Sequence, residues 1–198
     1  MRVVGLTGGI ASGKSTVSSY LRLSRIPIFD ADASARQAVA QGSKCLHEIR
    51  EAFGTGVLKA DGTMDRNAMA QVVFRDAKAR QLLEKIIVEG FVLPQAAKFV
   101  QEHKNEKIVV MDMPLLIECG YYKQVDEVWL VVLDEQTQIE RACARDNMTE
   151  AEAIGRIKAQ MPLLEKKKYA DVLLDNTGSI SELEQQVALA IERIVDYR

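Results

Sequence analysis

Short apolar runs alternate with helical patterns along most of the chain. The runs predicted to form strands lie at residues 2–6, 26–30, 107–112, 127–133 and 171–175. They are rich in β-branched residues and almost continuously apolar, which is typical of strands covered on both faces, and the helices between them provide the crossovers that parallel strands require. This pattern predicts an α/β fold with a doubly wound sheet of about five parallel strands flanked by helices.

Two stretches interrupt the alternation. Residues 41–104 contain no convincing strand, and their helical patterns at 67–74, 78–89 and 92–103 are separated by glycines and turns. We interpret this stretch as a helical lobe inserted into the domain. The second stretch, residues 141–168, is highly charged and is interpreted as a mobile lid. The core of the single predicted domain then consists of residues 1–40, 105–140 and 169–198.

Composition narrows the class of protein. A chain of 198 residues with 47% hydrophobic content suits one compact core with a small inserted lobe. Its 26 basic and 28 acidic residues nearly cancel, so we expect neither a nucleic-acid nor a membrane partner. No apolar run approaches the roughly 18 residues of a membrane span, and the first apolar run is predicted to be a strand and not a leader peptide. We expect a soluble, cytoplasmic protein that is a monomer or a weak homo-oligomer.

Cysteines and histidines give little sign of chemistry. Cys45, Cys119 and Cys143 are far apart and form no CxxC pair, which suits reduced thiols acting as small buried hydrophobic groups. His47 and His103 lack a partnering cluster, so neither a histidine metal site nor a Ser-His-Asp triad is supported, and both are expected on the surface.

The strongest signal follows the first predicted strand. Residues 8–15 read GGIASGKS, which satisfies G-x-x-x-x-G-K-[ST] between a strand and a helix. In such a phosphate loop, successive backbone N–H groups and the positive end of the following helix form an anion-binding cradle. The chain is therefore predicted to be a P-loop protein that binds ATP or GTP through Gly8, Ala11, Ser12, Gly13, Lys14, Ser15 and Thr16.

Individual residues of the loop have distinct predicted roles. Lys14 is expected to reach the β- and γ-phosphates, and Thr16 the α-phosphate. The Ser15 hydroxyl is expected to bind Mg²⁺, a hard cation that prefers oxygen ligands.

A pair of carboxylates follows the second predicted strand. Asp30 and Asp32 lie at its carboxyl end, the edge of an open α/β sheet at which ligands bind. A sugar hydroxyl is too weak an acid to ionise at neutral pH, so a carboxylate there could orient it and accept its proton, and we assign this role to Asp32. Capping of the next helix is the alternative for both residues. A D-x-D pair can also hold a divalent metal, but Ser15 and the phosphates already provide a metal site here.

Three more charged residues are candidates for the site. Asp112 ends the third predicted strand and is a candidate for holding the water shell of the metal, with a strand-end turn as the alternative. Arg141 and Arg145 are four residues apart on one helix face, where they could clamp the phosphates during transfer. Surface pairing with the neighbouring Asp146 is equally compatible with their spacing.

The run Lys166 to Lys168, taken alone, is typical of a solvated helix face.

Four blocks of sequence together resemble the dephospho-coenzyme A kinase family over nearly the whole chain. They are the phosphate loop from Leu6 to Val17; Asp30-Ala31-Asp32 with Ala35-Arg36; the D-x-P-L-L-x-E stretch from Asp112 to Glu118; and a set comprising Arg141, Arg145-Asp146, Arg156, Gln160-Met161-Pro162, Lys166, Ala170-Asp171 and Asp175-Asn176-Thr177-Gly178.

The resemblance implies a specific reaction and acceptor. It implies transfer of the ATP γ-phosphoryl group to the ribose 3′-hydroxyl of dephospho-coenzyme A, with Mg²⁺ as cofactor and Asp32 as the base. It also implies that the helical lobe binds the acceptor, that the arginine-rich segment closes as a lid, and that Asn176 lies by the adenine. The acceptor pocket would be bordered by Pro114, Leu115 and Leu116.

One segment departs from the family pattern. The family commonly carries a His-Pro pair after an L-x-x-I helical segment, whereas Leu83 to Ile87 is followed here by Val88-Glu89. Without proline the helix is expected to run on, and without histidine a polar group that could face the acceptor is lost.

Three other functions compete with this interpretation. A P-loop kinase for another small acceptor, such as a nucleoside monophosphate or a sugar acid, would share the fold and the phosphate loop. A GTP-dependent switch would need a guanine-reading N-K-x-D segment, which the sequence lacks. A nucleotide-binding module without catalysis is disfavoured by the intact Lys14, Ser15 and Asp32.

Overall fold

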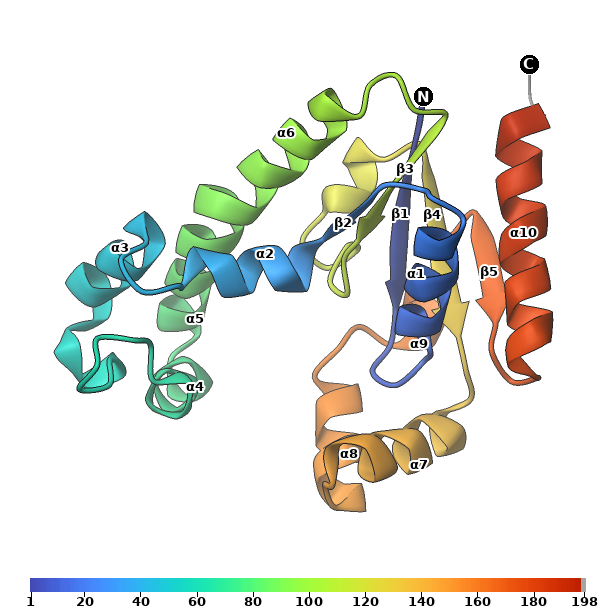
Figure 1. Cartoon of the computed structure of the whole chain (residues 1–198). Helices are drawn as coiled ribbons and strands as arrows, with labels where there is room; N and C mark the ends of the chain where they lie inside the picture. The colour runs from blue at the N-terminus through green and yellow to red at the C-terminus, as the bar shows by residue number, and fades with distance from the viewer. Residues whose placement is uncertain (197–198) are drawn as a thin grey trace. The chain divides into compact units, whose positions relative to one another are not determined.

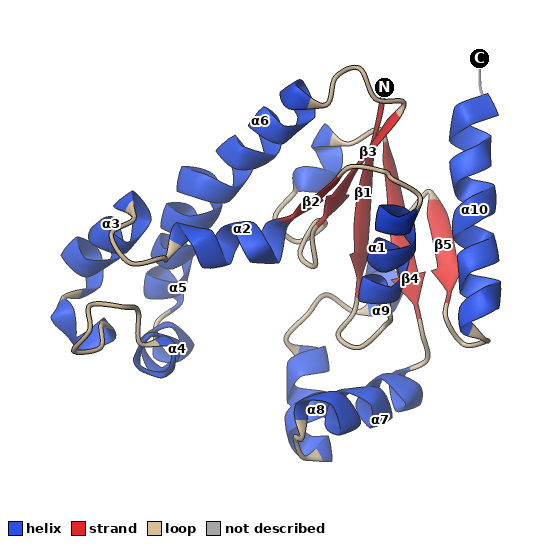
Figure 2. Ribbon diagram, in the orientation of Figure 1, coloured by secondary structure: helices blue, strands red, loops and turns tan. Residues whose placement is uncertain are grey.

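A parallel sheet of five strands forms the centre of the fold, as predicted (Figures 1 and 2). The computed structural model describes residues 1–196. The strand order is β2-β3-β1-β4-β5. The strands are β1 (Arg2–Gly8), β2 (Ile28–Asp30), β3 (Ile108–Asp112), β4 (Glu127–Val132) and β5 (Val172–Asp175), each starting and ending within two residues of its predicted position.

The order of the strands sets where the site can form. Central β1 pairs in parallel with β3 on one side and β4 on the other, and β4 pairs in parallel with β5. Their carboxyl ends therefore lie along one edge of the sheet, the edge at which such folds bind ligands. The phosphate loop leaves the sheet there, between β1 and α1 (Lys14–Leu23).

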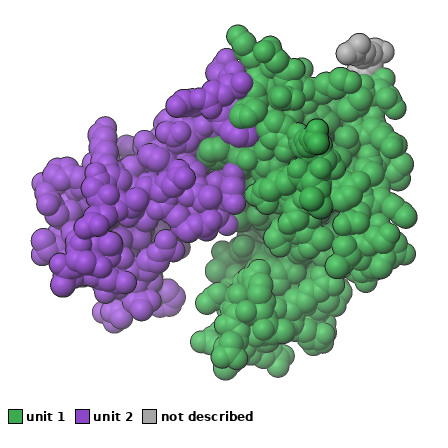
Figure 3. Space-filling model, viewed as in Figure 1, with its two compact units in different colours: residues 1–29, 103–198 green, residues 30–102 purple. Residues whose placement is uncertain are grey.

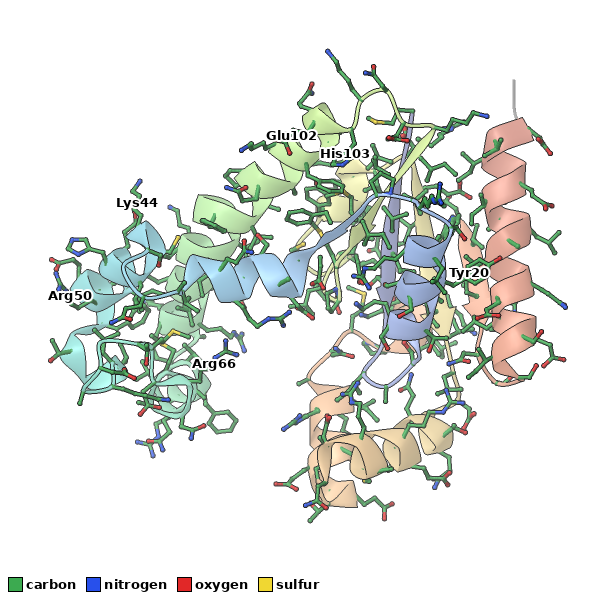
Figure 4. All side chains as sticks on the ribbon, viewed as in Figure 1. Tyr20, Lys44, Arg50, Arg66, Glu102 and His103 are labelled. Carbon is green, nitrogen blue, oxygen red and sulfur yellow. The ribbon has the colours of Figure 1, made fainter. Side chains whose placement is uncertain are left out.

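The main core lies between the sheet and two helices, α1 and α10 (Ile180–Asp196). Trp129 of β4 is fully buried in it, and Tyr20 of α1, labelled in Figure 4, packs against it. The period of buried residues along both helices matches the apolar stripe expected of a helix that covers a sheet. The buried members from the two helices are Val17, Leu21, Leu183, Val187 and Ala190.

The chain divides into two compact units, coloured separately in Figure 3. Unit 1 comprises residues 1–29 and 103–198, and unit 2 comprises residues 30–102. This division differs from the predicted one, because helix α2 (Ala31–Ala38) belongs to unit 2 and not to the core segment 1–40. The end of the predicted core segment 169–198 lies outside the described residues, since these stop at 196.

Unit 2 is helical and has its own core. After α2 come α3 (Lys44–Phe53), the short η1 (Thr55–Val57), α4 (Arg66–Arg75), α5 (Ala77–Glu84), the π-helix η2 (Lys85–Val92) and α6 (Leu93–Glu102). Ile49, Val57 and Met69 are buried at its centre. Aspartate and serine side chains cap the first turns of α2, α3, α4 and α5, which explains where these helices begin.

The segment without the His-Pro pair lies in the π-helix. Val88 and Glu89 are within η2, which continues directly from α5 and passes directly into α6. The prediction that the helix runs on through this segment is therefore confirmed. A π-helix has i→i+5 hydrogen bonds and is rare, so this stretch is a local departure from α-helical geometry and not a break.

The remaining helices belong to unit 1. These are η3 (Tyr121–Gln124), α7 (Glu135–Asp146), α8 (Glu150–Lys158) and α9 (Leu163–Lys167). Helices α7 and α8 form a small core of Ile139, Ala142 and Ala153, against which Ile10 and Ala11 of the phosphate loop pack. Among residues 1–196, none of the helices is long and apolar enough to cross a membrane.

The cysteines have different environments. Cys45 is buried, and its burial raises the pKa of its thiol. Cys119 is exposed, so the prediction that all three cysteines act as buried hydrophobic groups is wrong for this residue.

Candidate active site

The phosphate loop is held in a shape that directs its backbone toward an anion. Gly13 has a φ of 96°, a left-handed conformation that glycine adopts without strain, and Ala11 also has a positive φ of 54°. Gly13 is the N-cap of α1, and no side chain caps the first turn of this helix. Its N–H groups are therefore oriented to bind an anion, as the sequence motif predicts.

Asn176, in the segment after β5, binds the phosphate loop. It follows β5, is 5% exposed, and donates a hydrogen bond from Nδ2 to the Ser12 carbonyl oxygen at 2.8 Å. The same amide group lies so close to Gly13 that a Cβ at this position would collide with it. The resemblance placed Asn176 by the adenine, but it did not indicate this contact with the loop.

Replacing Asn176 tests its contact with the loop. Asn176→Ala leaves the buried Ser12 carbonyl without this donor. An unsatisfied buried acceptor should destabilise the loop conformation by about 1–2 kcal/mol. We expect ATP to bind about tenfold more weakly, measured by titration calorimetry. Thr177→Ala, at the adjacent exposed position, is the matched control and should bind ATP as the wild type does. Unchanged ATP affinity in Asn176→Ala would mean that the loop keeps its shape without this bond.

Lys14 and Asp112 form an ion pair beside the loop. Lys14 Nζ pairs with Asp112 Oδ1, and the other carboxylate oxygen accepts a hydrogen bond from Ser18 Oγ at 2.5 Å. Lys14 and Ser18 are one turn apart on α1, so the end of β3 is bound to the first two turns of this helix. Ser18, which the sequence analysis did not identify, therefore fixes the orientation of Asp112.

The two arginines of α7 have different partners. Arg141 donates to the Asn176 carbonyl oxygen at 3.5 Å. Arg145 instead forms two hydrogen bonds of 2.8 Å with Asp146, and these bonds hold the pKa of that carboxyl group below its usual range. Arg156 of α8 lies 3.7 Å from the same carboxylate. The pairing with Asp146, one of the two alternatives for this arginine, is thus present for Arg145, and a joint phosphate clamp stays a prediction.

A cavity of about 510 Å³ joins the loop to α7 and to the segment after β5. This volume lies in the usual range for small-molecule sites. The cavity brings together six of the predicted ATP-binding residues, and Arg141 as well. Its lining residues are Ala11, Gly13, Ser15, Thr16, Arg141, Ala144, Arg145, Asn176, Gly178 and Ile180.

Other predicted residues are not part of this cavity lining. Gly8, Ser12 and Lys14 lie in the same loop but do not line the cavity. Asp32 is an exposed residue in the first turn of α2, within unit 2. The N-cap of this helix is Asp30, whose side chain accepts from the Ala33 N–H at 2.8 Å. The capping alternative therefore applies to Asp30, and Asp32 follows it as an acidic residue in the first turn of the helix.

The predicted acceptor-side residues follow Asp112 directly. Leu115 is 51% exposed, whereas Leu116 is fully buried. Leu116 packs against Gly5 so closely that a Cβ added to Gly5 would lie 2.6 Å from the leucine side chain. The Leu116 side chain therefore belongs to the core, and its place at the border of the acceptor pocket stays a prediction. The Pro114 carbonyl oxygen accepts a hydrogen bond from Thr7 Oγ1 at 3.0 Å, which ties this stretch to the end of β1.

Comparison with known proteins identifies the family. The family model described as dephospho-CoA kinase matches residues 2–182. The dephospho-CoA kinase of Shouchella clausii is 45% identical over 193 residues, which cover 96% of this chain and 97% of that protein. This chain is a member of the dephospho-CoA kinase family.

Two solved structures share this fold over nearly the whole chain. A protein from Thermus thermophilus has 31% identity and a TM-score of 0.82, with 97% of each chain covered. The dephospho-CoA kinase from Campylobacter jejuni has a TM-score of 0.64 over 98% of this chain and 97% of that one; at 22% identity this likeness shows the fold alone. The family and the fold that the sequence indicated are both confirmed.

Two blocks that carry the resemblance to dephospho-CoA kinases contact each other in the structure. Lys166 of α9 is 1% exposed and forms a 2.8 Å ion pair with Glu118, the last residue of the D-x-P-L-L-x-E stretch. The prediction that the run Lys166 to Lys168 is a solvated helix face is thus wrong for Lys166. It is confirmed for Lys167 and Lys168, which are exposed. A local charge pattern cannot distinguish these neighbours, because burial of Lys166 depends on a partner 48 residues earlier in the chain.

Proposed function

We propose that this protein transfers the γ-phosphoryl group of ATP to the ribose 3′-hydroxyl of dephospho-coenzyme A, producing ADP and coenzyme A. The cavity beside the phosphate loop carries the proposal, because it combines the backbone cradle with Ser15, Thr16 and Arg141 in a member of the dephospho-CoA kinase family. The proposed site of action is the cytoplasm, and the proposed form is a monomer or a weak homo-oligomer.

The residues beside the loop suit a magnesium ion bound together with ATP. Ser15 and Asp112 offer a hydroxyl and a carboxylate, the hard oxygen ligands that Mg²⁺ prefers. Within residues 1–196 there is no group of three or more His, Cys, Asp or Glu side chains that could hold a metal ion. Mg²⁺ usually binds to one or two protein oxygens, and phosphates and water complete its coordination. When bound, the ion would neutralise charge on the phosphates during transfer.

The proposed mechanism depends mainly on position and charge. Lys14, which pairs here with Asp112, would bind the β- and γ-phosphates, and the N–H groups of the loop would hold the phosphate chain. Arg141, and Arg145 if it leaves Asp146, would stabilise negative charge on the transferred group. Asp32 would orient the ribose hydroxyl and accept its proton as the new P–O bond forms.

Two segments of the chain would bind and enclose the substrates. In the proposal, residues 41–104 bind the acceptor together with Pro114 and Leu115, and residues 141–168 act as the lid. Closure of a lid excludes water, to which the phosphoryl group would otherwise be transferred.

A coupled assay of ADP tests the function most directly. Purified protein with MgATP should form ADP in proportion to added dephospho-coenzyme A, one ADP for each coenzyme A produced. Coenzyme A is the matched control compound, because it differs only by the 3′-phosphate and offers no hydroxyl at that position. ADP formation stimulated by a nucleoside monophosphate, and not by dephospho-coenzyme A, would overturn the proposal.

A further inference from the structure

The buried lysine of α9 has no role in the mechanism proposed above. Lys166 is 1% exposed, and its ammonium lies 2.8 Å from Glu118 Oε1 and 3.5 Å from the Pro114 carbonyl oxygen. A charged group is costly to bury without partners, so this ammonium depends on both contacts. Its position is therefore specified by the segment that follows β3.

Both partners of Lys166 have further bonds. Glu118 Oε1 also accepts a hydrogen bond from the Met161 N–H at 3.3 Å, and the Pro114 carbonyl oxygen also accepts one from Thr7 Oγ1 at 3.0 Å. Thr7 is fully buried and directly precedes the phosphate loop. Lys166 thus joins α9 to the segment after β3 and, through Pro114, to the end of β1. Glu118 also binds Met161, in the chain between α8 and α9.

The same part of the chain contacts the phosphate loop directly. Gln160 Oε1 accepts a hydrogen bond from the Ile10 N–H at 2.9 Å. Residues 160–166, which we name the return segment, therefore bind the phosphate loop at one end and the Pro114–Glu118 stretch at the other. The return segment follows α8 and is part of the charged segment 141–168, so through Gln160 it connects that segment to the phosphate loop.

We propose that Lys166 is a positioning residue for phosphoryl transfer. Its ammonium holds the return segment against the Pro114–Glu118 stretch. This contact fixes the position of the phosphate loop relative to that stretch, which the proposed function assigns to the acceptor side. In-line transfer requires the reacting atoms to be held within a narrow range, and a displacement of about 1 Å can lower the rate about 100-fold. This inference rests on the proposed function, since it assigns Pro114 and its neighbours to the acceptor side.

A purely structural ion pair is the competing explanation, and a double variant separates the two. Lys166→Met alone leaves Glu118 without its cation and is expected to lower stability, so its activity is ambiguous. Lys166→Met with Glu118→Gln removes both charges, and neutral groups of similar size often replace an ion pair without loss of stability. Lys107→Met is the matched control, because Lys107 is exposed and lies outside the segments that the proposal assigns to the acceptor lobe and the lid.

The test measures thermal unfolding, kcat, the KM for ATP, and the ratio of ADP to coenzyme A formed. For the double variant we expect an unfolding temperature close to that of the wild type, a kcat lower by at least about tenfold, and little change in the KM for ATP. The ratio of ADP to coenzyme A should rise above one, because a misplaced acceptor allows water to compete. Lys107→Met should match the wild type in all four measurements.

Two results would overturn the inference, and each has its own meaning. A double variant that folds and keeps wild-type kcat and a ratio of one would show that Lys166 only stabilises the fold. A wild-type protein that forms no coenzyme A would overturn the proposed function, and this inference with it. The first result leaves the proposed function intact, so the two failures can be distinguished.

Discussion

Asp32→Asn is expected to lower kcat by at least about 100-fold while leaving ATP affinity within about twofold of the wild type. The substitution keeps the shape of the side chain but removes its ability to accept a proton. Asp32 is exposed in the first turn of α2, so the loss of its charge should lower helix stability by no more than about 1 kcal/mol. Steady-state kinetics with dephospho-coenzyme A and an independent binding measurement for ATP give the two quantities.

Asp30→Asn is the matched control for this substitution. Asp30 caps α2 by accepting a hydrogen bond from the Ala33 N–H, and asparagine caps a helix about as well as aspartate does. The control should therefore keep most of its activity. A normal kcat in Asp32→Asn would assign this carboxylate to the helix terminus alone, and a large loss in Asp30→Asn would move the base to that residue.

Lys14→Ala should remove most activity for a different reason. The ammonium is expected to bind the phosphates, and loss of one such charged donor typically lowers kcat by about 10²–10³-fold. The substitution also leaves Asp112, whose side chain is 6% exposed, without its cation. Because the Lys14 side chain keeps 19% exposure, we expect a loss of roughly 2–3 kcal/mol in the free energy of unfolding, less than for a fully buried pair.

A double variant separates the two effects of Lys14. Lys14→Ala with Asp112→Asn removes the unpaired charge, and the asparagine can still accept the hydrogen bond from Ser18. Denaturant unfolding should show recovery of most of the lost stability, whereas activity should stay low. Recovery of activity in the double variant would mean that Lys14 serves only as the counter-ion of Asp112.

The strands and the phosphate loop could be predicted because their signals are local. A run of β-branched apolar residues between helical patterns specifies a buried parallel strand wherever it occurs in the chain. The loop motif needs no distant partner, since its glycines, lysine and hydroxyl act through their own backbone and the helix that follows. Asp112 could be placed for the same reason, because it ends a predicted strand at the edge where ligands bind.

Prediction was weakest where the environment of a side chain depends on distant residues. Leu115 and Leu116 are adjacent leucines, yet one is exposed and the other fills the space beside Gly5. Arg145 donates hydrogen bonds to Asp146, whereas Arg141, on the same helix face, donates to the carbonyl oxygen of Asn176. The spacing of the arginines and the family resemblance of the leucines identified these residues as candidates, but neither determined which residues each side chain would contact.

By itself, therefore, the sequence determined the fold class, the phosphate loop and, through its four blocks, the family. Only the tertiary structure decided that Asn176 supports the loop through Ser12, that Ser18 orients Asp112, and that Lys166 is buried. The physical reason is that backbone conformation follows largely from local pattern, whereas burial and pairing of a polar side chain depend on segments that meet only when the chain folds. The phosphate loop is readable from eight consecutive residues, but the contacts that hold it come from distant parts of the chain, among them Asn176, Gln160 and Asp112.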